Sequence, residues 1–169
     1  MSGSQPARLI GFLWNPDHAD DDLRETQLAA ASLQLDVLKL PLRRIPDVDG
    51  SLQMAKTARV DALVVVSSRL TALASQRIID FALANRLPLM SGWGSWVKRG
   101  GLMAYGPNLD QSARRLAGYV DKLLKGSRAA DLPIEQPTQF ELGLNLRTAR
   151  ALGLTILPSL LARADEVIE

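Results

Sequence analysis

The residues best suited to binding a ligand lie directly after, or at the end of, short apolar runs in the sequence. These positions are Asn15, Asp17, Ser67, Ser68, Arg69, Gly92, Trp93, Ser95 and Tyr105. Hydroxyls, an amide and backbone N–H groups suit a carboxylate or another small polar group, and the Trp93 indole can cover an apolar part of the ligand. Turn formation and helix capping explain Asn, Asp and Ser at such positions equally well, so both interpretations stay open.

A hydrolase is the main catalytic alternative. His18 is the only histidine, and together with Ser67 and the nearby acids it suggests a catalytic triad. No G-x-S-x-G turn surrounds a serine, however, and a loop histidine among aspartates is typical of a solvated side chain. We therefore expect no catalytic residue and no enzyme activity.

No metal or cofactor is expected. Asp17, Asp20, Asp21 and Asp22 carry four carboxylates that suit a hard cation, but the segment lacks the Gly and the distal Glu of an EF-hand loop. These acids instead favour the positive end of a helix that begins after them. The chain also contains neither a Walker A motif nor a G-x-G-x-x-G motif, so nucleotide binding is unsupported.

Composition indicates a globular protein of 169 residues that does not bind nucleic acid. Its 20 Lys and Arg are scattered, the net charge is only +2, and 5% of residues are aromatic. With no cysteine, disulfides and thiolate metal sites are excluded. No apolar run approaches the roughly 18 residues of a membrane span. The N-terminus does not resemble a secretory signal, which predicts a cytoplasmic location for the chain as written.

Strands alternate with helices along most of the chain. Apolar runs at 8–14, 35–40, 61–66, 87–91, 101–105 and 139–145 predict strands. The segments at 23–33 and 52–59 favour helices, and 67–86 favours a loop followed by a helix. The run "DALVVV" is rich in β-branched residues, which is typical of a parallel strand covered on both faces. This order predicts right-handed crossovers and an open, doubly wound, mainly parallel α/β sheet.

A helix is predicted at 109–125, after a short strand bounded by glycines. Its apolar positions 113, 116, 117, 120, 123 and 124 lie on one face. Asn108 is the expected N-cap, Gln111 takes the reciprocal position of a capping box, and Gly126 ends the helix. The segment 127–138 has no periodicity and reads as a tether. Beyond it, Asn145 is expected to cap a helix that Gly153 stops, and a last helix begins near Pro158.

Several segments resemble the bacterial ABC transporter substrate-binding proteins, in the group that includes tryptophan binders. The most specific are "GGLMAYGPN" at 100–108, "DLPIEQPTQFEL" at 131–142 and "NLRTARALGLTILPSLLARADEVIE" at 145–169. "WNPDHADDDLRETQLAAASL", "DALVVVSSR" and "RLPLMSGWGSWVKRGGLMAYG" are similar to the family as well, so the resemblance covers most of the chain. Leu157 departs from the pattern, since the family often has a further proline before Pro158.

The resemblance implies one lobe of a type I periplasmic-binding-protein fold. Residues 1–169 would form a single α/β domain equivalent to the second lobe, with a core at 8–105 and 139–169 and a hinge-crossing helix and tether at 106–138. Such proteins hold a small solute between two lobes and deliver it to an ABC permease in the periplasm. The implied function is binding of a solute such as an amino acid without chemistry, by a truncated protein.

The family's first lobe and export signal have no counterpart in this chain. Without that lobe, the apolar face of the 109–125 helix loses its usual cover. Either the helix folds back on its own sheet, or the chain forms a homodimer through this face. The alternative function is therefore a self-associating remnant that no longer binds solute.

Overall fold

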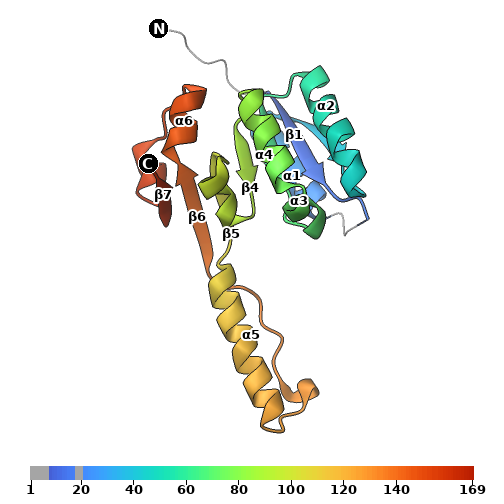
Figure 1. Ribbon diagram of the computed structural model, residues 1–169, viewed down its shortest axis with the longest axis vertical. Coiled ribbons are helices and arrows are strands. Elements are labelled where there is room, and N and C mark those ends of the chain that lie inside the picture. The colour runs from blue at the N-terminus through green and yellow to red at the C-terminus, as the bar shows by residue number, and fades with distance from the viewer. Residues whose placement is uncertain (1–7, 18–20) are drawn as a thin grey trace.

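The computed structural model describes residues 8–17 and 21–169, and within them a seven-stranded sheet forms the body of the protein (Figure 1). The strand order is β2-β1-β3-β4-β5-β6-β7. The strands are β1 Leu9–Trp14, β2 Asp36–Pro41, β3 Ala62–Val65, β4 Leu89–Ser91, β5 Met103–Pro107, β6 Phe140–Asn145 and β7 Glu166–Ile168. All neighbours pair in parallel except β5 and β6. The predicted doubly wound, mainly parallel fold is confirmed.

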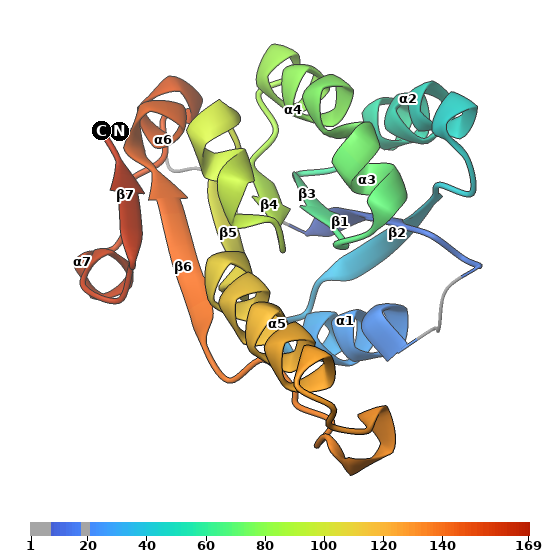
Figure 2. The ribbon, with the colours of Figure 1, turned by 60° about the horizontal axis from the view of Figure 1, so that its bottom comes forward.

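Helices cover both faces of this sheet (Figure 2). Helix α1 (Asp21–Ser32) lies on one face and buries Leu23 and Ala30. Helices α2 (Val48–Ala58), α3 (Arg69–Leu73) and α4 (Ser75–Ala84) lie on the other. The main hydrophobic core forms beneath this second layer, where side chains such as Leu63, Ile78 and Trp96 are almost fully buried.

The structure differs from the predicted elements at several boundaries. The segment 67–86, predicted as a loop followed by a helix, contains two helices that meet at Ala74. The helix predicted from 52 begins at Val48, after the short 3₁₀ helix η1 (Ile45–Asp47). The elements that were not predicted include the 3₁₀ helix η2 (Gly94–Arg99) and the edge strand β7. Both are too short to produce the periodicity on which sequence analysis depends.

Helix α5 (Leu109–Leu124) projects away from the sheet (Figure 1). Asn108 caps it as predicted, since its Oδ1 accepts a hydrogen bond of 2.7 Å from the backbone N–H of Gln111. The chain then returns through the 3₁₀ helix η3 (Ala129–Asp131) to β6. No residue of α5 is buried, so the helix does not fold back on its own sheet. In the described ranges, no helix has the length and apolar character needed to cross a bilayer.

The C-terminal part completes the far edge of the sheet. Helix α6 (Leu146–Leu152) is capped by Asn145, whose Oδ1 accepts a bond of 2.9 Å from Thr148 N, and it ends at Gly153 with φ of 72°. Both features were predicted. Asn145 is buried, and its side-chain N–H₂ also donates to the Val97 carbonyl at 2.6 Å. After α7 (Pro158–Leu161), β7 pairs with β6.

Candidate functional site

The ends of β3, β4 and β5 approach one another so closely that a Cβ atom at either of two glycines would meet a neighbouring segment. A Cβ atom on Gly92 would lie 2.2 Å from the Ser67 hydroxyl oxygen. A Cβ atom on Gly106 would lie 2.1 Å from the carbonyl oxygen of Gly92. Ser67, Gly92 and Gly106 therefore form a compact row where the strands end, which is the position at which open α/β sheets bind ligands.

A groove of about 350 Å³ runs along this row. Its floor is apolar and comes from the sheet, with Phe12 on β1, Val64 on β3, Tyr105 on β5 and Phe140 on β6. The Tyr105 and Phe140 rings stack with their centroids 5.7 Å apart, and each is about half exposed, at 51% and 49%. Exposed, stacked aromatic rings offer a flat surface to an apolar ligand group.

Helix α1 supplies a polar wall to the same groove. Asp22, Glu25 and Thr26 line it from the first turns of the helix. Their i, i+3 and i+4 spacing places them on one face of α1, and this spacing is the signal that would have identified them. The groove lining contains two carboxylates and no Lys or Arg, but Glu25 also pairs with Arg24 at 3.1 Å. Asp22 is therefore the carboxylate that most favours a ligand group with positive charge.

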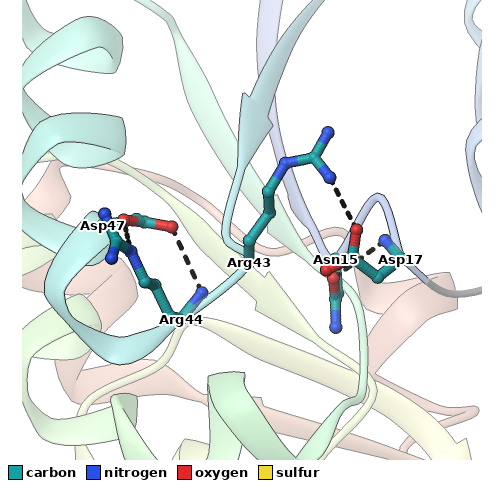
Figure 3. Close-up of polar contacts among 5 residues, drawn as sticks. All are labelled: Asn15, Asp17, Arg43, Arg44 and Asp47. Carbon is teal, nitrogen blue, oxygen red and sulfur yellow. Dashed lines mark hydrogen bonds and ion pairs between the residues drawn. The ribbon is translucent and has the colours of Figure 1, made fainter.

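Three of the nine predicted site residues line this groove: Ser67, Gly92 and Tyr105. Asn15 and Asp17 lie at the end of β1, where the Asn15 Oδ1 accepts a bond of 3.0 Å from the Asp17 backbone N–H (Figure 3). The Asp17 carboxylate pairs with Arg43 at 2.6 Å. The sequence analysis did not identify Arg43 as a neighbour of Asp17, because it assigned site residues only to the loops after other strands. Parallel strands end at one edge of the sheet, so the loop after the second strand lies beside the loop after the first.

The neighbouring Arg44 does not face Asp17. Its guanidinium lies 3.0 Å from the Asp47 carboxylate (Figure 3). This hydrogen bond holds the pKa of Asp47 below its ordinary value. The pair therefore brackets the 3₁₀ helix η1, whereas Arg43 reaches the loop after β1.

The other four predicted residues do not line the groove. Ser68 is the buried N-cap of α3, and its hydroxyl accepts from the Thr71 backbone N–H at 3.2 Å. Arg69, the first residue of α3, and Ser95, on η2, are exposed. Trp93 packs against the hydrophobic core, and its buried indole N–H has no hydrogen-bond partner among the described residues.

The structure provides no distances that support a catalytic triad or a metal site. His18 and Asp20 lie outside the described residues, so no distance relates His18 to Ser67. Asp21 and Asp22 occupy the first turn of α1, as expected for acids at the positive end of a helix. In the part of the chain that the structure describes, no three potential metal ligands gather.

A second hollow continues from the groove across the sheet. Its volume is about 490 Å³, and it shares Tyr105 and Phe140 with the groove. Met90, Met103 and Leu142 extend its apolar floor. The stacked aromatic pair thus lines both hollows.

Comparison with known proteins identifies relatives over nearly the whole chain. The family model described as ABC transporter substrate binding protein matches residues 6–168. A search of curated proteins found no significant match. A conserved domain protein from Vibrio cholerae is similar in structure, with a TM-score of 0.84, 26% identity, and coverage of 95% of this chain and 55% of that one.

Two further solved structures share the fold. An ABC domain from Streptococcus pneumonia in complex with L-Trp gives a TM-score of 0.86 at 21% identity, covering 96% of this chain and 57% of the other. A ligand-free, open substrate-binding protein with adhesive properties from Clostridium difficile gives 0.65 at 18% identity, covering 96% and 55%. The chain therefore spans little more than half the length of these proteins.

Proposed function

Because the chain belongs to the family of ABC transporter substrate-binding proteins, we propose that it binds a small solute for import and does not alter it chemically. Proteins of this family bind small molecules and work with ABC transporter components. The observation that carries the proposal is the groove along Ser67, Gly92 and Gly106, which lies where the strands end and combines an apolar floor with a polar wall.

We propose that the solute is an amino acid with an apolar or aromatic side chain. The carboxylates of Asp22 and Glu25 suit the ammonium group, and the Tyr105 and Phe140 rings suit the side chain. The Ser67 hydroxyl is a donor for the carboxylate. The Streptococcus pneumonia neighbour holds L-Trp, which makes tryptophan the first ligand to test.

Three related compounds separate the contributions of the ligand's groups. L-Tryptophan has both charged groups, tryptamine lacks the carboxylate, and indole-3-propionate lacks the amine. A ligand at 100 times its Kd stabilises the protein by about 2.7 kcal/mol, which a thermal-shift assay detects. We expect tryptophan and tryptamine to raise the Tm and indole-3-propionate to act only weakly. No shift with any of these compounds or with the other amino acids would count against solute binding.

The acidic wall has a matched control on the same helix turn. Asp22 lines the groove, whereas the adjacent Asp21 does not and is highly exposed. Asp22→Asn and Glu25→Gln are expected to weaken ligand binding about tenfold or more, since each removes a charged partner of the ammonium group. Asp21→Asn makes the same charge change and should leave the Kd unchanged. Equal effects of Asp21→Asn and Asp22→Asn would contradict an ammonium site at this wall.

We also propose that residues 1–169 represent the second lobe of a two-lobed binding protein, with residues 106–138 as the hinge-crossing segment. The chain covers only 55–57% of the solved neighbours, and α5 projects from the sheet at the glycine-bounded end of β5. In this proposal the protein acts in the periplasm beside an ABC permease. The groove would then form one wall of the binding site. Residues 1–169 alone would bind the solute more weakly than a protein in which two lobes close around it.

A further inference from the structure

The end of the molecule opposite α5 carries an excess of exposed cations. Strands β1 to β5 begin there, α2 and α4 end there, and α6 starts there after β6 (Figure 1). The exposed cations at this end are Arg8, Lys56, Arg59, Arg86, Arg147 and Arg150. The exposed acids are Asp36, Asp61 and Glu169, so positive charge exceeds negative charge.

Most of these cations are not neutralised within the chain. Among the described residues, no ion pair involves Lys56, Arg59, Arg86 or Arg150, and these four residues are called the basic end. The nearby Asp61 carboxylate is already engaged, because it accepts hydrogen bonds from two backbone amides at 2.8 and 2.9 Å. The basic end therefore offers its charge to an external partner.

Two of the four cations occupy backbone positions that disfavour them. Arg59 follows α2 and Arg86 follows α4, each in the left-handed conformation, with φ of 55° and 53°. This conformation favours glycine and is costly for a residue with a side chain. A cation suits the end of a helix, but Gln34 takes the same conformation after α1 without a charge. The helix ends alone therefore do not require arginine.

The basic end lies away from every other binding surface described above. In the two-lobed protein proposed above, the other lobe joins through residues 106–138, and α5 projects from the opposite end of the sheet (Figure 1). The groove lies where the parallel strands end, whereas the basic end lies where they begin. A partner bound at the basic end would thus leave both the groove and the other lobe unobstructed.

We propose that the basic end binds the anionic headgroups of a phospholipid bilayer. Arg59 and Arg86 lead into the neighbouring strands β3 and β4, and α6, which carries Arg150, follows β6, two strands further along the sheet. The cations thus spread over about 15 Å, at about 5 Å for each strand. None of them lines the groove or the adjoining hollow. Such a spread suits an extended anionic surface better than a single small anion.

Vesicle co-sedimentation tests this proposal. The unmodified chain should sediment with vesicles of equal parts phosphatidylglycerol and phosphatidylcholine, should not sediment with phosphatidylcholine alone, and should dissociate as salt is added. Arg59→Gly with Arg86→Gly should weaken binding about twentyfold, since each cation near an anionic bilayer strengthens binding about fivefold. Glycine suits both backbone positions, so circular dichroism should show an intact fold. No binding to the anionic vesicles at low salt, or equal binding to neutral ones, overturns the proposal.

Two controls separate the basic end from other causes of weaker binding. Gln34→Gly makes the same change in backbone preference without removing a charge. Arg114→Gln with Arg128→Gln removes the same charge from α5 and the segment after it. Both should bind anionic vesicles within about twofold of the unmodified chain. A loss in either control equal to that of Arg59→Gly with Arg86→Gly overturns the proposal. Thermal shifts with solutes should be the same in this double variant, so solute binding and bilayer binding fail independently.

Discussion

Adding one methyl group at Gly106 is expected to destabilise the protein more than any other change to its glycines near the groove. The new Cβ would lie 2.1 Å from the Gly92 carbonyl oxygen, well inside the 3.0 Å below which such contacts are essentially never found. The added Cβ is fixed by the backbone of β5, and the oxygen belongs to the backbone directly after β4, so no side-chain rotation relieves the contact. We expect Gly106→Ala to cost about 3 kcal/mol, which corresponds to a fall in Tm of about 6–12 °C.

Gly92→Ala provides the comparison. Its Cβ would lie 2.2 Å from the Ser67 hydroxyl oxygen, but that hydroxyl can rotate to another rotamer, so the expected cost is about 1 kcal/mol. In a Ser67→Ala background the oxygen is gone and the nearest contact is 3.4 Å, so the cost of Gly92→Ala should fall to about zero. Ser67→Ala should not rescue Gly106→Ala.

Urea unfolding followed by circular dichroism measures all of these variants. Gly50→Ala serves as the control, since Gly50 lies in α2 with no atom within 4 Å of an added Cβ, and alanine there should stabilise the protein by up to about 1 kcal/mol. If Gly106→Ala is as stable as the unmodified chain, or if Ser67→Ala fails to rescue Gly92→Ala, the close approach of the three strands is refuted.

Two further substitutions test contacts that hold the edges of the sheet. Asn145→Leu removes the cap of α6 and leaves the buried Val97 carbonyl with only the 3.3 Å bond from the Gly100 N–H, so we expect the free energy of unfolding to fall by about 2–4 kcal/mol in urea titrations. A loss below about 1 kcal/mol would contradict both Asn145 contacts. Hydrogen bonds from the Leu9 and Arg8 amides lower the pKa of Asp61 in the folded protein. The ionised carboxylate therefore stabilises the fold at any pH above the unfolded pKa, which is near 3.8. This stabilisation is lost as the pH falls through the lower pKa of the folded state. Asp61→Asn should therefore cost about 1 kcal/mol at pH 7, a difference that shrinks between pH 4 and pH 2; a difference independent of pH would contradict the role of the charge.

Sequence patterns predicted the sheet because the strands are continuous in the chain and strongly apolar. Caps were equally predictable, since Asn108, Asn145 and Gly153 act through neighbours three or four residues away. The break at Ala74 was not predictable, because α3 and α4 together keep one apolar face and no proline or glycine marks the junction. Strand β7 contains three residues and depends on pairing with β6, a contact that the local sequence does not encode.

The groove was only partly predictable for a related reason. Loops after strands pointed to Ser67 and Gly92, since the ends of parallel strands meet at one edge. Phe12, Val64 and Phe140 were expected to be strand residues, and only the three-dimensional arrangement shows that they form the floor of a groove. Turn residues such as Asn15 look the same in sequence whether their side chains bind a ligand or the backbone, and here the Asn15 oxygen binds the Asp17 amide.

The junction of β5 and β6 makes α5 separable from the rest of the molecule. Pro107 pairs with Phe140, and the Asn108 amide donates to the Gln139 carbonyl at 3.0 Å, so the chain leaves the sheet and re-enters it at a single point. An Asn-Gly turn could replace 109–138 and close the two strands into an ordinary hairpin. Such a miniature protein would retain every strand of the sheet, and conversely this position could accept a foreign helix or a whole domain without disturbing the order of the strands.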